Sequence, residues 1–328
     1  MKIYFCETYY HLLVAILKNI KSKGENEIVI NAEFTNNRLI NDKKVIDNLQ
    51  KTKIFKKIYF FDFSEKQVEN RRSKFHFIKD LQLIKKIYKS KEYDFLQARE
   101  IYLFYDGGLI SRYLNWCKID YHLLEDGTDS FKNNSKQWQK ESFFKRMIKE
   151  KVFGFYKMGQ SPRIKTIEVN DKTGIDNLPE EKVIEFPKKK LFESISNDEK
   201  KEILNIFMPD FDSEEFKNSI LLITQPFWID GVLKTEQKQI EMYEDIIEKY
   251  AHNSKVIIKV HPRETTKYKQ HFPNCYVIDK PFPVEILLFC KDLSVEKAIT
   301  VSSTSVSSLD FAKERIFLGW DWLNEYKK

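Results

Sequence analysis

Short apolar runs alternate with longer segments of helical spacing along most of the chain. Runs rich in Ile, Val, Leu, Phe and Tyr predict buried strands in the first half, at 2–6, 27–31, 58–61, 101–105 and 121–124. Apolar residues spaced three and four apart predict helices between them, at 9–20, 42–50 and 75–93. Strands that alternate with helices in this way indicate a parallel sheet with helical crossovers.

The same alternation recurs after residue 190. Strands are predicted at 220–224, 255–260, 276–278 and 298–301, and helices at 198–207, 235–250, 284–289 and 305–313. Pro179, Pro187 and the run Lys188-Lys189-Lys190 interrupt both patterns between the two series. We therefore expect an α/β protein with two Rossmann-like, doubly wound domains facing a central cleft, over residues 1–185 and 190–328.

The composition agrees with two folded domains and also indicates the cellular compartment. The chain has 328 residues, more than one hydrophobic core usually serves, and its 42% hydrophobic content argues against disorder. The four cysteines form no CxxC pair, and the first apolar stretch reads as a strand because no small-residue cleavage site follows it. No apolar run approaches the ~18 residues of a membrane span. A cytoplasmic location is expected.

An acidic motif follows one of the predicted strands. Glu125-Asp126-Gly127-Thr128 comes directly after 121–124, and open α/β sheets bind ligands at the carboxyl ends of their strands. Of two adjacent, partly buried carboxylates, one tends to have a raised pKa, which suits a general base. An ordinary Asp-Gly turn also explains the pattern. Asp106, in Tyr105-Asp106-Gly107-Gly108 one strand earlier, is the alternative base.

A basic motif follows a strand in the second half. His261-Pro262-Arg263 comes after 255–260, and Pro262 biases His261 towards an extended backbone. With Lys259 nearby, this motif is a candidate phosphate site or general acid, although a surface turn with incidental basic residues explains it equally well. Gln225, at the end of the strand 220–224, is a candidate for the nucleotide side of the cleft.

A hydroxyl-rich motif, Ser302-Ser303-Thr304-Ser305, lies between the strand 298–301 and the predicted helix. Hydroxyls and backbone N–H groups at a helix amino terminus favour an anion, whereas simple N-capping needs only one of these residues. Thr8 and His11, which follow the first strand, are candidates for contact with donor or acceptor, and helix capping explains part of that pattern. Asp210-Phe211-Asp212 is interpreted as a loop rather than a metal motif.

Together and in this order, the Glu125-Asp126-Gly127, His261-Pro262 and Ser302-Ser303-Thr304 motifs resemble those of bacterial sialyltransferases of glycosyltransferase family 52, which build lipooligosaccharide or capsule. The opening segment Phe5-Cys6-Glu7-Thr8-Tyr9-Tyr10-His11-Leu12-Leu13 is also similar to the first strand and helix of that family. The resemblance spans nearly the whole chain, although each motif is only two to four residues long.

The resemblance implies a GT-B fold, CMP-sialic acid as donor, a galactoside-type acceptor on a surface glycan, an inverting mechanism, and no metal or other cofactor. It implies that Asp126 is the base, that His261 assists the departing CMP, and that Ser302 and Ser303 bind its phosphate. A homodimer is a further expectation. The chemistry agrees, because a carboxylate beside an oxocarbenium-like centre and donors beside a departing phosphate favour that transition state.

Other interpretations stay open. Another GT-B transferase, using Kdo or a nucleotide-diphosphate sugar, or a polyol-phosphate transferase, could share a His-Pro element and a phosphate-binding helix start. A pI near 8.9 with 26 Phe and 16 Tyr also prompts a nucleic-acid-binding protein. The aromatic residues follow strand and helix patterns rather than a basic-aromatic array, which argues against nucleic acid as a partner.

The net charge of +7 is concentrated in one segment. Residues 136–165 hold nine basic and two acidic residues, so the rest of the chain is formally neutral. Interleaved Phe, Ile, Val and Met residues make this segment resemble a basic amphipathic helix that docks on the inner face of the cytoplasmic membrane. A solvated helix face packed on the core explains it equally well.

Overall fold

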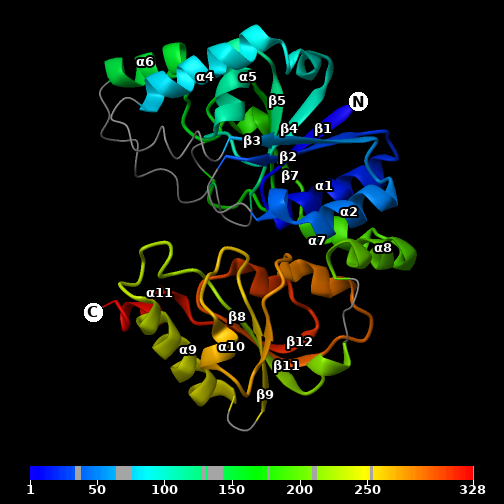
Figure 1. Ribbon diagram of the computed structural model, residues 1–328, viewed down its shortest axis with the longest axis vertical. Coiled ribbons are helices and arrows are strands. Elements are labelled where there is room, and N and C mark those ends of the chain that lie inside the picture. The colour runs from blue at the N-terminus through cyan, green and yellow to red at the C-terminus, as the bar shows by residue number, and fades with distance from the viewer. Residues whose placement is uncertain are drawn as a thin grey trace. The chain divides into compact units, whose positions relative to one another are not determined.

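The computed structural model describes residues 1–33, 38–63, 76–126, 131, 143–175, 178–208, 213–251 and 254–327. Their contacts divide the chain into two compact units, Met1–Ser194 and Ile195–Lys328. Each unit is built on its own parallel sheet with helices packed around it (Figure 1). Within the described ranges, no helix is long and apolar enough to cross a membrane.

The amino-terminal unit contains a seven-stranded sheet in the order β3-β2-β1-β4-β5-β6-β7, and every neighbouring pair is parallel. Its strands are β1 (Lys2–Cys6), β2 (Glu27–Ala32), β3 (Lys57–Asp62), β4 (Glu100–Leu103), β5 (Tyr121–Leu124), β6 (Ile164–Val169) and β7 (Val183–Glu185). Its helices are α1 (Tyr9–Ser22), α2 (Lys43–Thr52), α4 (His76–Ser90), α5 (Leu109–Cys117), α6 (Phe143–Phe153) and α7 (Lys188–Glu193).

The carboxyl-terminal unit contains a five-stranded parallel sheet in the order β10-β9-β8-β11-β12. Its strands are β8 (Ser219–Ile223), β9 (Lys255–Lys259), β10 (Tyr276–Ile278), β11 (Val295–Thr300) and β12 (Ala312–Phe317). Its helices are α8 (Asn197–Phe207), α9 (Glu236–Ala251), α10 (Tyr268–His271) and α11 (Gly319–Asn324). Two parallel α/β units of Rossmann-type strand order confirm the predicted fold class.

The central strands are buried along their whole length, which is why they read as apolar runs in the sequence. All six residues of β2 and all five of β8 are buried, as expected for strands covered on both faces. Helix starts are set by local hydrogen bonds. The Thr8 hydroxyl accepts the backbone N–H of His11 at 3.1 Å, and Ser196 forms a reciprocal capping box with Glu199 at the start of α8.

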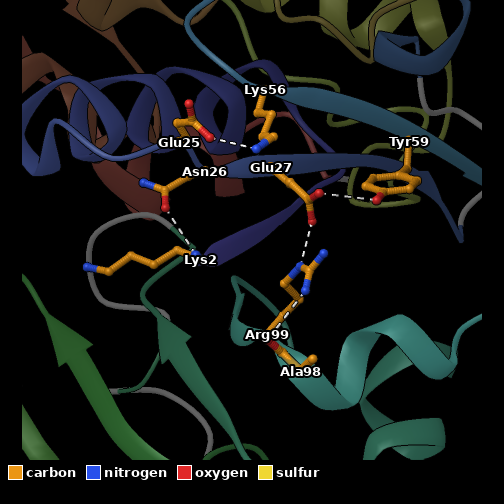
Figure 2. A network of polar contacts seen from close by, with 8 residues as sticks. All are labelled: Lys2, Glu25, Asn26, Glu27, Lys56, Tyr59, Ala98 and Arg99. Carbon is orange, nitrogen blue, oxygen red and sulfur yellow. Dashed lines mark hydrogen bonds and ion pairs between the residues drawn. The ribbon is translucent and has the colours of Figure 1, made fainter.

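A polar network closes the amino-terminal edge of the first sheet (Figure 2). The buried Glu27 carboxylate at the start of β2 accepts from Arg99 Nε at 2.8 Å and from the Tyr59 hydroxyl at 3.3 Å. The backbone N–H of Lys2 donates to Asn26 Oδ1 at 3.0 Å. These groups pair with one another, so this edge is structural, and the candidate chemistry lies at the opposite edge.

Three strands and several helices depart from the sequence expectations. Helices α5, α7, α10 and α11 were not predicted, and the helix expected at 284–289 is a 3-10 helix over Val284–Phe289. β6, β7 and β12 were not predicted, because they are short or carry charged, exposed residues rather than apolar runs. The predicted helix 305–313 is wrong, since Thr304–Ser308 forms only a 3-10 turn and β12 begins at Ala312. The hydroxyls of Ser307 and Ser308 donate to backbone carbonyls within this turn, a pattern in which Ser side chains compete with helix formation.

Candidate functional site

The candidate residues gather at the carboxyl ends of the strands in both units. In the first sheet the strand order reverses direction between β1 and β4, and in the second between β8 and β11, which is where ligands bind open α/β sheets. Glu7, Thr8 and Asp126 follow strands of the first sheet, and Gln225, His261 and Ser302 follow strands of the second. These residues form an amino-terminal site on the first sheet and a carboxyl-terminal site on the second.

The amino-terminal site is organised around a contact between His11 and Asp126. His11 lies in the first turn of α1, and its Nε2 is 2.5 Å from Oδ1 of Asp126, which follows β5. The His11 side chain is 3% exposed, whereas that of Asp126 is 40% exposed. The Asp126 carboxylate therefore contacts a buried histidine ring and is partly exposed to solvent. A general base that acts on an acceptor entering from solvent requires this combination.

Two further contacts fix the orientation of the His11 ring. Nδ1 of His11 accepts the backbone N–H of Glu7 at 3.2 Å, and the ring stacks on Phe104 with centroids 4.3 Å apart and planes 4° from parallel. Because Nδ1 is an acceptor, a neutral ring carries its proton on Nε2 and donates it to the Asp126 carboxylate. This hydrogen bond positions the Asp126 carboxylate.

Glu125 has a structural role beside Asp126. Its side chain is buried, and Oε2 accepts the backbone N–H of Asn170 at 2.6 Å, which joins the end of β5 to the end of β6. Its backbone carbonyl accepts from Lys188 Nζ at 2.7 Å. Gly127 and Thr128, the rest of the predicted motif, lie outside the described residues.

Lys188 was not among the residues predicted for the site. Its side chain is buried, and its ammonium lies 5.1 Å from the centroid of the Tyr10 ring. Burial lowers the pKa of Lys188, while the carboxylates of Glu125, Glu168 and Asp126 oppose that shift. The Lys188-Lys189-Lys190 run indicated only an interruption of periodicity, so nothing in the sequence marked this one ammonium as buried.

Two more carboxyl groups, those of Glu7 and Glu33, follow strands β1 and β2 of the same sheet. Burial raises the pKa of Glu7 well above its usual range, and the neighbouring carboxylates of Glu33 and Asp126 raise it further. The Glu33 carboxylate accepts the backbone N–H groups of Leu109 and Ile110 at the start of α5, the second at 3.0 Å. A Cβ at Gly108 would overlap Glu33 Oε2, so any larger residue at this position would have to displace the Glu33 carboxylate.

Asp106, the alternative base, lies in a different environment. Its side chain is 3% exposed, and Oδ2 accepts the backbone N–H of Gly159 at 2.8 Å. Burial raises the pKa of Asp106 to about 7, while the hydrogen bond from Gly159 opposes the shift. This carboxyl joins the loop after β4 to the segment before β6, which favours a structural role over proton transfer to a substrate.

Asp106→Asn separates these two roles. In the folded state Asp106 keeps its proton up to about pH 7, whereas the unfolded chain releases it near pH 3.8, so its ionisation costs folding stability as the pH rises between these values. Thermal unfolding should therefore show a smaller loss of Tm from pH 5 to pH 8 in the variant than in the wild type, with turnover retained. Loss of turnover at every pH would instead identify Asp106 as the base.

The carboxyl-terminal site is organised around His261, after β9. The backbone N–H of His261 donates to the Thr224 hydroxyl at 3.0 Å, and its ring Nδ1 accepts the backbone N–H of Arg263 at 3.1 Å across the turn that contains Pro262. A neutral ring therefore carries its proton on Nε2. This tautomer is a hydrogen-bond donor, as a group that assists a departing phosphate must be. The Arg263 guanidinium binds both carboxylate oxygens of Asp230.

A buried network supports the loops on both sides of His261. Gln239 Nε2 donates to the Glu264 carboxylate at 3.1 Å and to the Tyr268 hydroxyl at 2.8 Å, and Gln239 Oε1 accepts the backbone N–H of Trp228. Burial raises the pKa of Glu264 to about 7. The backbone N–H of Gln225 donates to the Tyr243 hydroxyl at 2.6 Å. The loop after β8 and the loop after β9 are thus fixed to one network.

The remaining candidate residues of this site differ in how far their polar groups are free to contact a ligand. Lys259 is buried, its ammonium donates to the carbonyl of Val260 at 2.8 Å and lies 4.2 Å from the centroid of the Phe282 ring, and burial lowers its pKa to about 7. These contacts favour a structural role for Lys259. Ser303 and Thr304 follow β11, where the Ser303 backbone N–H donates to Thr300 Oγ1 at 3.2 Å and the Ser303 hydroxyl lies 2.6 Å from that of Ser305.

The helix-terminus argument for phosphate binding at 302–305 does not hold, because the segment continues as a 3-10 turn rather than an α-helix. The hydroxyl and backbone groups at the end of β11 are what this motif offers to a ligand. Among the described residues, no group of three or more His, Cys, Asp or Glu side chains is arranged to hold a metal ion. The Asp210-Phe211-Asp212 string lies outside those residues.

Comparison with known sequences identifies a family. Residues 66–319 match the profile of glycosyltransferase family 52, which is well over half of the chain. An uncharacterized protein of Haemophilus influenzae is 33% identical over 201 residues, and the aligned region spans 61% of this chain and 61% of that protein. The matched region thus covers less than two thirds of this relative.

Comparison with solved structures concerns the fold. UDP-GlcNAc 2-epimerase of Methanocaldococcus jannaschii, in a crystal structure with UDP-GlcNAc and UDP, superposes with a TM-score of 0.51 at 14% sequence identity. The superposition covers 99% of this chain and 91% of the epimerase chain. At this level of identity the similarity shows a shared fold.

Proposed function

Because the chain belongs to glycosyltransferase family 52, we propose that it transfers sialic acid from CMP-sialic acid to a galactoside hydroxyl of a surface glycan, in lipooligosaccharide or capsule. We propose an inverting reaction that needs no metal ion. The observation that carries the proposal is the geometry of Asp126, a partly exposed carboxylate at the end of β5 that a buried histidine holds in place at 2.5 Å.

In this proposal Asp126 is the general base. The acceptor hydroxyl transfers its proton to the Asp126 carboxylate while its oxygen attacks the anomeric carbon of the donor. A single attack from the face opposite the leaving group inverts the configuration at that carbon. The Nε2–H of His11 keeps one carboxylate oxygen in place, so the other is directed to the acceptor without a cost of reorientation.

At the departing end, the bond between the anomeric carbon and the phosphate oxygen breaks, and its electron pair passes to the phosphate of CMP. The Nε2–H of His261 donates to that phosphate and stabilises the charge that develops on it. Ser302, Ser303 and Thr304 supply further donors, and Gln225 lies at the end of the neighbouring strand β8. A monophosphate leaving group lacks the diphosphate that often recruits a divalent metal.

The assay is CMP release from CMP-sialic acid in the presence and absence of a set of galactosides, with the sialylated product identified by mass. Acceptor-dependent CMP release that persists in EDTA is the expected result. A CMP-linked Kdo donor, UDP-linked sugars and a CDP-linked polyol are run beside it. Turnover of one of these donors alone would replace the sialyltransferase by the corresponding transferase, and RNA binding without any turnover would favour the nucleic-acid alternative.

A further inference from the structure

Helices α4 and α6 present an unusual outer face on the amino-terminal unit. Figure 1 shows α4, α5 and α6 side by side on one side of that unit, and contacts join each pair. Exposed apolar and basic side chains cover the outer faces of α4 and α6, which we call the α4/α6 surface: Ile78, Lys86 and Lys89 of α4, and Phe144, Ile148 and Val152 of α6.

The apolar part of this surface follows helical spacing. Phe144, Ile148 and Val152 are four residues apart, so they form one stripe along α6, and they are 70%, 48% and 47% exposed. A surface helix ordinarily directs such a stripe towards the core. Lys151 is exposed beside it, and Lys149 follows Ile148 in the helix. An exposed apolar stripe between lysines is the pattern of a helix that lies in a membrane interface.

The charge of the two helices is almost entirely positive. Together they hold eight basic residues, at 79, 85, 86, 89, 145, 146, 149 and 151, against the two acidic residues Asp80 and Glu150. Both acidic residues face an arginine, because Asp80 binds the buried Arg112 at 2.6 Å and Glu150 lies 3.1 Å from Arg146. Negative charge is therefore neutralised locally, and the lysines determine the field outside this face.

Buried contacts hold the two helices in fixed positions. Arg112 on α5 donates from Nη1 to Asp80 on α4 and from Nε to the carbonyl of Phe153, the last residue of α6. Asn115, one turn further along α5, donates to the carbonyl of Gly154 at 2.9 Å. Gly154 has φ +62 and its missing Cβ would lie 2.8 Å from the Arg112 carbonyl, so only glycine fits there. The exposed stripe is thus part of an ordered surface.

We propose that the α4/α6 surface docks on an anionic lipid bilayer, with the apolar stripe of α6 inserted between headgroups and the lysines of both helices facing lipid phosphates. Charge complementarity selects this occupant. A second copy of the chain would place the same excess of lysines against itself, and a nucleic acid would leave Phe144 and Ile148 in water. The inference stands independently of the proposed reaction, because it rests on residues outside both candidate sites.

The test is sedimentation of the full-length protein with vesicles of phosphatidylglycerol and phosphatidylethanolamine, compared with vesicles of phosphatidylcholine alone. The protein should sediment with the anionic vesicles and remain in solution with the neutral ones. Raising the salt from about 0.05 M to about 0.5 M should release most of it, because screening shortens the reach of the lysine charges.

Two variants and a matched control locate the docking surface. Phe144→Ser with Ile148→Ser, and separately Lys86→Glu with Lys89→Glu, should each lower vesicle affinity about tenfold or more without lowering Tm, since all four side chains are exposed. Lys43→Glu with Lys51→Glu on α2 makes the same charge change on another helix of this unit and should change vesicle affinity about twofold at most.

Unchanged vesicle binding in both surface variants would overturn the proposal, as would equal binding to neutral vesicles. A dimer in analytical ultracentrifugation that either surface variant dissociates would show that a second copy covers the face, which also overturns it. Turnover of a water-soluble galactoside should be the same in every variant. Vesicle binding without sialyl transfer would refute only the proposed function, and transfer without vesicle binding would refute only the docking surface.

Discussion

Asp126→Asn abolishes transfer in the mechanism proposed above, with a fall in kcat of about 10²–10⁴-fold, the range that general-base catalysis contributes. The amide keeps the shape of the side chain and can still accept from His11 Nε2, but it cannot take a proton from the acceptor. CMP affinity, measured by calorimetry, should stay within about twofold, because Asp126 acts on the acceptor hydroxyl and not on the nucleotide. Near-normal turnover would remove Asp126 as the base and make Asp106 the next residue to test.

His11 gives an internal check on the same step. His11→Ala should lower kcat about tenfold or more, His11→Gln should restore part of that loss because its amide can donate to Asp126, and the pH profile of kcat should move in the Ala variant only. The double variant with Asp126→Asn should lose no more than Asp126→Asn alone, since both residues act through one carboxylate. His122 on β5, which hydrogen-bonds Thr166, provides a matched histidine control that leaves turnover unchanged.

His261→Ala should reduce both transfer and CMP affinity, each by about tenfold or more. Because Nδ1 of the ring accepts the backbone N–H of Arg263, Nε2–H is the donor available to a phosphate. Loss of this donor weakens the binding of CMP and also the stabilisation of the transition state. Calorimetry with CMP and steady-state kinetics measure the two effects. His271→Ala, at an exposed position on α10, serves as the control for loss of a histidine.

A fall in kcat with unchanged CMP affinity would contradict this assignment, because it would show that His261 does not contact the phosphate of bound CMP. Unchanged kcat and affinity would leave His261-Pro262 as a structural turn, the alternative that the sequence left open. The substitution of His261 leaves the buried contacts of Gln239 with Glu264 and Tyr268 in place. The variant is therefore expected to fold, and its Tm should equal that of the wild type.

The fold could be predicted from the sequence wherever burial leaves an apolar run. β1 and β5 lie at the expected residues, because their positions are set by side chains that each strand buries. β10 also lies at the expected residues, although its side chains are exposed or only partly buried. β12 could not be found in this way, since its pairing with β11 holds a strand of mostly charged, exposed residues. The helix expected at 305–313 failed because serine hydroxyls there bond to the backbone of a tight turn.

The candidate site was predictable as residue types but not as contacts. The acidic motif and the first helix each suggested a functional residue, yet the sequence could not indicate that His11 and Asp126, 115 positions apart, meet. Lys188 was concealed for a related reason. A lysine in a basic run is ordinarily exposed, and only the position of α7 against the end of β5 buries its ammonium.

The hydrogen bond from Lys188 to the Glu125 carbonyl bears on how the chain can be divided for experiments. The boundary expected from the sequence places the end of the first domain at residue 185, whereas the first compact unit extends to Ser194. A fragment that stops at 185 would remove the ammonium that supports the backbone one residue before Asp126. It would also leave a buried carbonyl without its donor. An amino-terminal fragment intended to retain the geometry of Asp126 should therefore include α7.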